Sequence, residues 1–318
     1  MKAAALARFG PPSVLTLHEL PVPSPGPREV LIAIDTAGVG TWDASIRDGS
    51  WRTPGRPRFP LVPGTDGAGT IVATGSRVTR FRVGDCVYAY EFGNRQGGFY
   101  AEFVVADADH VGRVPGALSL RDAGAAATIG LTALQGIRRL RLRPQDTVLI
   151  FGASGAVGTM AVQFAAQQRA HVIATASGKT AARLVRRLGA NAIIDARQDA
   201  AIDRLRELSG EGIDAVFALA GGTELERCLD FVRQGGRVVH PNGIEPVPRR
   251  RRTFQIQTFD AEASPTEFAS LNRRLSRSGI RVPIAATYPL ARVADAHRRL
   301  DRGRIAGRIV LRIGSRQR

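Results

Sequence analysis

The chain opens with short segments in which apolar and polar residues alternate, a pattern typical of half-buried strands. Turns rich in glycine and proline separate these segments, which recur as far as about residue 106. The expected strands are Lys2–Ala7, Val14–Leu20, Glu29–Thr36, Gly67–Thr74, Asp85–Tyr90 and Tyr100–Ala106. Strands of this length and spacing predict a small, mostly antiparallel, barrel-like domain over residues 1–118.

Beyond Leu118 the pattern changes to strands that alternate with amphipathic helices, the first of them beginning at Ser119. This alternation predicts an α/β fold with a doubly wound parallel sheet over residues 119–279. The last segment, residues 280–318, is expected to return to the first domain. The strands expected in the second domain are Thr147–Phe151, His171–Thr175, Ala192–Ile194, Ala215–Leu219, Arg237–His240 and Phe254–Thr258.

A glycine-rich loop joins the strand Thr147–Phe151 to an apolar helix. In this context backbone N–H groups at the helix start can face a pyrophosphate, and the glycines let it approach closely. The loop therefore predicts dinucleotide binding. The residues expected to contact the cofactor here are Gly152, Ala153, Ser154, Gly155, Ala156 and Val157.

The end of the following strand indicates which dinucleotide binds. An acidic residue there would hold the ribose 2′-hydroxyl of NAD, but the sequence continues Thr175-Ala176-Ser177-Gly178-Lys179, and no acidic residue occurs between Asp146 and Asp195. Ser177, Lys179 and Arg183 are available to bind a 2′-phosphate. We therefore expect NADPH rather than NADH.

The composition of the chain argues against several other classes of protein. The apolar runs are strand-sized, well short of the roughly 18 residues of a membrane span, and no signal-type apolar core follows Met1. Cys86 and Cys228 lie far apart, without partners at metal-ligand spacing. We expect a cytoplasmic protein that is neither a disulfide scaffold nor a cysteine-rich zinc module.

The formal charge of +17 is concentrated in one part of the chain: residues 1–118 carry +1 and residues 119–318 carry +16. Of the 45 basic residues 43 are arginine, which is typical of codon composition acting on solvated positions. The run Arg249–Arg252 is expected to be a solvated loop, although a contact with nucleic acid stays open as an alternative.

Short motifs of a recognisable kind recur along nearly the whole chain. They include Phe9-Gly10-Pro11-Pro12, Val62-Pro63-Gly64-Thr65-Asp66-Gly67-Ala68-Gly69, Gly97-Gly98-Phe99-Tyr100-Ala101-Glu102, Gly130-Leu131-Thr132-Ala133, the Gly152–Gly158 loop and Leu188-Gly189-Ala190. In these motifs the sequence resembles the medium-chain dehydrogenase/reductase superfamily, in its zinc-free quinone oxidoreductase (zeta-crystallin-like) branch. The resemblance implies a GroES-like catalytic domain, a Rossmann domain that binds NADPH, and a homodimer joined through the edge of the Rossmann sheet.

The resemblance also bears on metal and on the cofactor's neighbours. The positions that hold catalytic zinc in alcohol dehydrogenases of the superfamily correspond to Gly40, Thr65 with Asp66, and Thr128, so no set of zinc ligands is expected. Thr132 and the turn Asn242-Gly243 are implied as neighbours of the nicotinamide.

The catalytic residues are not evident from the sequence. Candidates for the acceptor pocket are Trp42, Asp43, Tyr88, Tyr90 and His240, with Phe92 and Tyr100 as further aromatic candidates. Asp43 is expected mainly as a structural hydrogen-bond acceptor, and His240 mainly as a structural histidine at a strand end.

Together these features predict a zinc-independent, NADPH-dependent oxidoreductase that transfers hydride to a quinone or an α,β-unsaturated carbonyl. Two alternatives stay open: an NADPH-binding redox sensor or RNA-associated protein with little turnover, and an enoyl-thioester reductase.

Overall fold

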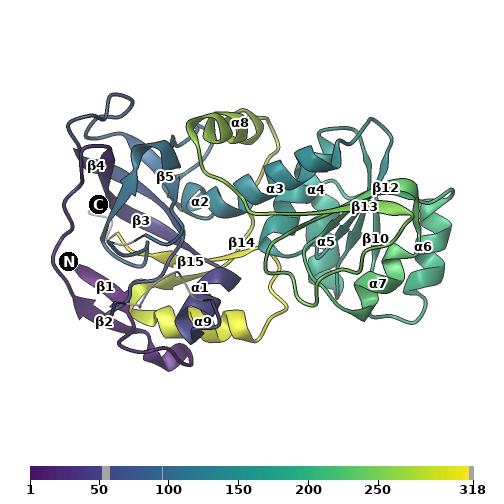
Figure 1. The fold of residues 1–318 in the computed structure, drawn as a ribbon, viewed down its shortest axis with the longest axis horizontal. Coiled ribbons are helices and arrows are strands. Elements are labelled where there is room, and N and C mark those ends of the chain that lie inside the picture. The colour runs from purple at the N-terminus through teal and green to yellow at the C-terminus, as the bar shows by residue number, and fades with distance from the viewer. Residues whose placement is uncertain (52–57, 95, 315–318) are drawn as a thin grey trace.

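The computed structural model describes residues 1–51, 58–94 and 96–314. It has two lobes, and both ends of the described chain lie in the first (Figure 1). That lobe contains β1 (Lys2–Ala5), β2 (Thr16–Glu19), β3 (Glu29–Val39), α1 (Thr41–Asp48), β4 (Asp66–Thr74), β5 (Cys86–Tyr90), β6 (Phe103–Asp107), β7 (Val111–Arg113) and α2 (Leu120–Gly124).

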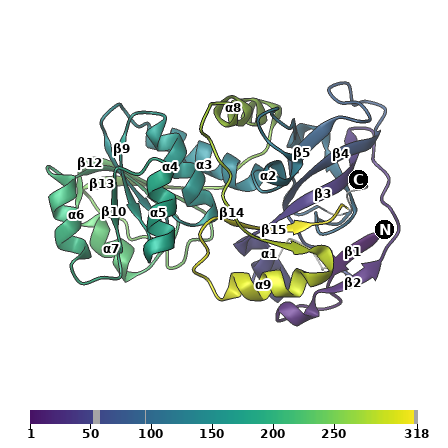
Figure 2. The same cartoon turned by 180° about the vertical axis from the view of Figure 1, so that it is seen from behind.

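The C-terminal part of the chain completes the main sheet of this lobe. Its strands follow the order β14-β15-β3-β4-β5-β7, where β14 is Ile284–Pro289 and β15 is Arg308–Arg312. Helix α9 (Val293–Asp301) connects these two strands and lies in the first lobe in both views (Figures 1 and 2). The antiparallel pairing of β15 with β3 places Arg308 near Gly38 and Gly40.

The second lobe is built on a six-stranded parallel sheet in the order β10-β9-β8-β11-β12-β13. In chain order this is 3-2-1-4-5-6, so the expected doubly wound sheet is confirmed. Its elements are α3 (Ala127–Leu140), β8 (Thr147–Phe151), α4 (Ala156–Ala166), β9 (His171–Thr175), α5 (Lys179–Arg187), β10 (Ala192–Ile194), α6 (Ala201–Ser209), β11 (Ile213–Ala218), α7 (Thr223–Leu229), β12 (Val232–Pro241), β13 (Phe254–Phe259) and α8 (Pro265–Leu275).

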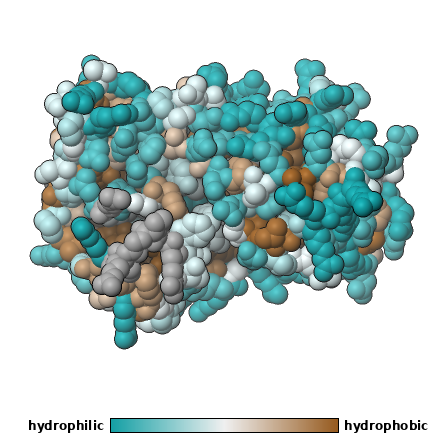
Figure 3. Space-filling model, in the orientation of Figure 1, coloured by the Kyte–Doolittle hydropathy of each residue, from teal (hydrophilic) through white to brown (hydrophobic). Residues whose placement is uncertain are grey.

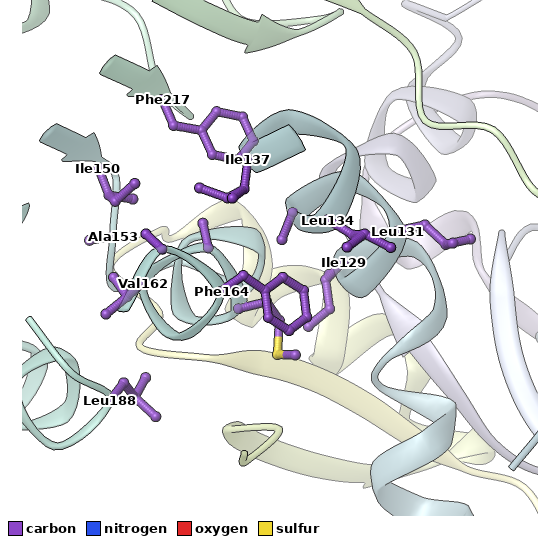
Figure 4. Packing of buried hydrophobic residues seen from close by; sticks show 14 of the residues in the cluster. Ile129, Leu131, Leu134, Ile137, Ile150, Ala153, Val162, Phe164, Leu188 and Phe217 are labelled. Atoms are coloured by element: carbon purple, nitrogen blue, oxygen red, sulfur yellow. The ribbon is translucent and has the colours of Figure 1, made fainter. Parts of the chain in front are cut away.

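Helices α3 and α4 pack side by side against one face of this sheet (Figure 4). The side chains of Ile137, Phe164 and Phe217 are almost fully buried there. A Cβ on Gly136 would come closer than 3.0 Å to the ring of Phe217, so only glycine allows this approach. These buried side chains fix β8 relative to α4 and thereby position the loop between them.

Helix α8 joins local and tertiary features. Its buried residues Phe268, Leu271 and Leu275 recur at helical spacing. In α8, Ser264 accepts a hydrogen bond from the Glu267 N–H and Phe268 packs against Tyr88 of β5. Capping and tertiary contact thus stabilise it.

Hydrophilic residues predominate on the face of the molecule in Figure 3, with only small hydrophobic patches between them. No helix among the described residues is both long enough and apolar enough to span a membrane.

Candidate nucleotide site and interlobe cleft

The glycine-rich loop lies at the carboxyl end of β8 and leads into α4. Gly152 adopts a φ of +84°, and its N–H donates a hydrogen bond of 2.7 Å to Thr175 Oγ1. A Cβ on Gly158 would lie closer than 3.0 Å to Gly152 O, so α4 can pack onto the strand only with glycine here. The first N–H groups of α4 are left free for an anion.

A cavity of about 320 Å³ opens beside this loop. It lies at the carboxyl ends of parallel strands, where ligands bind in open α/β sheets. Its lining includes Gly152, Ser154, Thr175 and Ser177, which the sequence predicted as cofactor contacts. The other lining residues are Phe151, Ala176, Ala181, Ala196, Arg197, Ala220, Gly221, Glu224, Arg304, Ile305 and Ala306.

The charged residues near the cavity differ in part from those expected. Ser177 Oγ donates a 2.7 Å hydrogen bond to Asp195, so an acidic group does lie near the end of β9. The sequence did not indicate this because Asp195 follows the neighbouring parallel strand. Lys179 and Arg183 are exposed on α5 and do not line the cavity, whereas Arg197 and Arg304 do.

A C-terminal segment crosses in front of the loop. The Gly307 N–H donates to Ser154 O at 2.9 Å, and a β-bridge joins Gly155 to Gly307. Gly303, Arg304 and Gly307 have positive φ, so the segment follows a tightly turned path. This path brings Arg304 to the nucleotide cavity from the chain's far end.

Three aromatic side chains gather on the first lobe near the turn that follows β12. The ring centroids of Trp42 and Trp51 are 4.6 Å apart, and Phe92 lies 5.8 Å from Trp42 and 5.9 Å from Trp51. A Cβ on Gly243 would lie 3.0 Å from the Trp42 ring. Trp42 therefore meets the Asn242-Gly243 turn of the second lobe, and the two lobes meet here.

Two of the other aromatic candidates belong to the core. Tyr88 is fully buried, donates a hydrogen bond to Asn272 and packs against Phe268 of α8, so the prediction that it lines an acceptor pocket is wrong. Tyr100 is also fully buried and bonds to His297. Tyr90 stays partly exposed; burial, Asp66 and Asp260 raise its pKa to about 12.

Asp43 is fully buried and accepts a 2.7 Å hydrogen bond from the N–H of Gly40. Arg47 can only donate, so its 3.2 Å contact with His297 Nδ1 makes Nδ1 the acceptor and leaves Nε2–H to donate to Tyr100. The Tyr100 hydroxyl is then free to donate to Asp43, where burial raises the pKa to about 7. Asp43 thus lies at the end of a row of buried polar groups, and its Oδ1 has no hydrogen-bond partner among the described residues.

The remaining predicted site residues lie around the carboxyl edge of the sheet. His240 is buried and its Nδ1 lies 3.1 Å from Pro241 O, as expected of a structural histidine. Thr132 Oγ1 donates to Thr128 O within α3. Asn242 is exposed, and its Oδ1 accepts the N–H of Gly243.

The positions that correspond to zinc ligands surround a guanidinium. Arg308 Nη2 lies 2.7 Å from Asp66 Oδ1, both side chains are buried, and Thr128 N–H donates to Asp66 Oδ2. Nη1 of Arg308 would lie 3.4 Å from a Cβ on Gly40. The described residues contain no group of three or more His, Cys, Asp or Glu placed to bind a metal. Without soft or imidazole ligands, and with a fixed positive charge, this place does not fit zinc.

The arginine run lies in the loop before β13. Arg251 pairs with Glu226 at 3.0 Å and also with Asp230, so this arginine holds the loop onto α7. Arg249, Arg250 and Arg252 are exposed, as the solvated-loop interpretation expects.

The residues that sequence reasoning missed are Trp51, Arg197, Arg304 and Arg308. Arg197 had a detectable signal, because it follows the third parallel strand and such strand ends share one edge. Nothing local to the sequence distinguishes the other three from ordinary surface residues.

Comparison with known proteins identifies the family of the chain. Family models match residues 26–116 (alcohol dehydrogenase GroES-like domain) and residues 188–311 (zinc-binding dehydrogenase). A quinone oxidoreductase of Lama guanicoe is 33% identical over 326 residues, which cover 98% of this chain and 97% of the relative.

Two solved structures share the fold over almost the whole chain. An NAD-dependent alcohol dehydrogenase superposes with a TM-score of 0.91 at 29% identity, covering 99% of this chain and 100% of the other. A mycobacterial protein complexed with NADPH superposes with a TM-score of 0.86 at 29% identity, covering 98% of this chain and 99% of the other. The chain belongs to the medium-chain dehydrogenase/reductase superfamily, in its quinone oxidoreductase branch. It is thus an oxidoreductase with a GroES-like domain and a Rossmann-like domain.

Proposed function

We propose that the protein is an NADPH-dependent reductase that works without a metal and transfers hydride to a quinone or an α,β-unsaturated carbonyl. The observation that carries this proposal is the presence of a glycine-loop cavity and of an aromatic cluster where the lobes meet, while a guanidinium fills the place of the metal. The reduced nicotinamide supplies the hydride when bound.

The residues of this chain have separate parts in that reaction. The Gly152–Gly158 loop holds the diphosphate through backbone N–H groups at the start of α4. Trp42, Trp51 and Phe92 offer ring faces and edges to a planar acceptor and keep water from one side of it. Holding both reactants in one orientation supplies much of the rate enhancement, since an electron-poor acceptor needs little further activation.

Preference for NADPH is proposed from the positive charges around the adenosine end of the cavity. Arg197 and Arg304 line it, Lys179 begins α5 beside it, and Asp195 and Glu224 oppose them. Three cations against two carboxylates favour a ligand with an added phosphate.

Fluorescence titration with NADPH and NADH tests the cofactor, using Lys179→Ala, Arg304→Ser and, as a matched control, Arg187→Ala at the far end of α5. Losing a charge-assisted phosphate contact should weaken NADPH binding about tenfold, since such bonds contribute about 1.5–3 kcal/mol. NADH binding and the control should not change. Equal binding of NADH and NADPH by the unaltered protein would contradict the preference.

Steady-state oxidation of NADPH across quinones, enones and an enoyl thioester tests the reaction. We expect turnover with quinones or enones, unchanged after incubation with a strong zinc chelator. Tight NADPH binding with no turnover of any acceptor would favour the redox-sensor alternative, and turnover confined to the thioester would favour an enoyl-thioester reductase. Loss of activity on chelation, restored by zinc, would overturn metal independence.

A further inference from the structure

Buried polar atoms without a hydrogen-bond partner concentrate at one place, where the start of α3 meets the first lobe. Among the described residues, Asp43 Oδ1, Thr128 Oγ1, Arg308 Nε and Glu267 Oε2 are buried without a hydrogen-bond partner. Asp66 links two of the four residues directly, since it binds Thr128 N and Arg308 Nη2, and Asp43 feels the charges of both Arg308 and Asp66. Buried polar atoms are rarely left without partners, so such a concentration points to a polar ligand.

The guanidinium of Arg308 is held in a fixed position. Its own N–H donates to Pro283 O at 2.8 Å, and Nη2 is bound to a carboxylate whose other oxygen accepts from Thr128. A Cβ on Gly38 would come closer than 3.0 Å to Nη2 and to Asp66 Oδ1, so glycine makes room for the pair. Arginine keeps its charge at any working pH and carries five N–H donors, of which Asp66 uses one.

This cluster lies where the two lobes meet. Tyr90 stands opposite Asp66 in the pairing of β4 with β5, and Asp260 of the second lobe is close enough to raise its pKa. Nη1 of Arg308 faces Gly40, which precedes the helix that carries Trp42, and Trp42 contacts the Asn242-Gly243 turn. Nη1 of Arg308 thus lies beside the residue that caps the helix carrying Trp42, on the side of the first lobe that meets the second.

We propose that Arg308 is a catalytic residue that binds the carbonyl oxygen of the acceptor, with the Thr128 hydroxyl as a second donor. This inference rests on the proposed function. As the hydride and its two electrons reach the acceptor carbon, an electron pair of the conjugated system moves to the oxygen, which becomes an oxyanion beside the guanidinium. The reduced nicotinamide is oxidised, and water then supplies the proton. Positioned donors of this kind stabilise developing charge without reorganisation.

The test uses a nitrophenol as a probe, because its phenolate resembles the oxyanion of a reduced quinone and absorbs visible light. The protein with bound NADP⁺ is titrated with the probe at several pH values. We expect the pKa of the bound phenol to fall by about one unit or more, a tenfold preference for phenolate, and to return to the value in solution in Arg308→Met. For that variant kcat/KM with quinones should fall about 100-fold, as for loss of an oxyanion donor.

Two further variants separate catalysis from folding. Arg237→Met removes an ion pair with Asp146 away from the cleft, and it should leave the phenol pKa shift intact. If Arg308→Met does not fold because Asp66 is left buried and unpaired, the double variant Asp66→Asn, Arg308→Met removes both charges together. NADPH binding reports that each variant is folded.

A phenol pKa shift that persists in a folded variant without Arg308 would overturn the inference, even if the protein reduces quinones well. Failure of the unaltered protein to reduce any acceptor would instead overturn the proposed function, while the phenol titration would still report the role of Arg308.

Discussion

At the scale of single residues, the structure buries charged side chains, and the burial of each one alone would cost much free energy. Asp43, Asp66, Arg47 and Arg308 are all buried, and each has at least one polar or charged partner. Burial without such partners would cost several kcal/mol for each charge. Asp43 has the weakest compensation, since one of its carboxylate oxygens has no partner.

The free energy of unfolding should therefore depend on pH through the titration of Asp43. Folding raises its pKa from 3.8 to about 7, so the folded state binds this proton more strongly than the unfolded state. The contribution of Asp43 to the free energy of unfolding is therefore fully present below its unfolded pKa of 3.8. It falls as the pH rises from 3.8 to about 7 and stays low above the folded pKa. Relative to Asp43→Asn, the unaltered protein should lose on the order of 4 kcal/mol across that range.

Urea denaturation of both proteins between pH 4 and pH 8 measures this difference, with Asp203→Asn on exposed α6 as a control for net charge. A constant difference between the unaltered protein and Asp43→Asn at every pH would show that the carboxyl stays ionised in the fold.

At the scale of elements, the strand–loop–helix unit β8–α4 requires close packing more than particular side chains. Gly158 is its tightest contact, because a Cβ would press on both Gly152 O and Ala153 Cα. Such a side chain must push the helix away from the strand and so move the N–H groups at the start of α4, which we propose hold the cofactor.

Gly158→Ala should therefore weaken NADPH binding by at least about tenfold, because a displacement at the helix start misplaces several donors together. Isothermal titration measures the affinity, and circular dichroism checks the fold. Gly116→Ala is the matched control, since a Cβ there meets nothing within 4 Å. Unchanged affinity in Gly158→Ala would mean that the loop does not hold the diphosphate.

At the scale of the whole molecule, the parallel sheet has two edge strands, β10 and β13, of which β13 is the longer. Strand β13 is the last in the order, and its residues Gln255 and Gln257 are exposed. An edge of this kind is either protected or paired. Pairing of two copies of β13 about a two-fold axis would give the homodimer that the family resemblance implies.

The double variant Gln255→Glu, Gln257→Glu should then shift the protein toward monomer, because like charges face each other across the two-fold axis. Gln255→Lys, Gln257→Lys should do the same, while an equal mixture of the two variants should dimerise again. Sedimentation velocity distinguishes these states. Variants that all sediment like the unaltered protein would place the dimer contact elsewhere or exclude a dimer.

The sequence by itself determined the features that depend on neighbouring residues. The strand Thr147–Phe151, its glycine loop and the following helix are encoded within about twenty residues, and the alternation of strands with helices is enough to predict a doubly wound sheet. Local steric and hydrogen-bonding preferences decide such units, so the fold class and the strand–loop–helix unit could be predicted, while cofactor binding by the loop stays a prediction.

Only the tertiary structure decided which distant residues share a site. Arg308 meets Asp66 across 242 positions, Arg304 lines the same cavity as Ser154, and Asp195 bonds to Ser177 although the two residues follow different strands. Tyr88 lies in the core because Phe268 of α8, a helix far along the chain, packs against it. These contacts depend on the register in which the returning segment pairs with the first lobe and on how distant elements pack, and no local preference in the sequence specifies either.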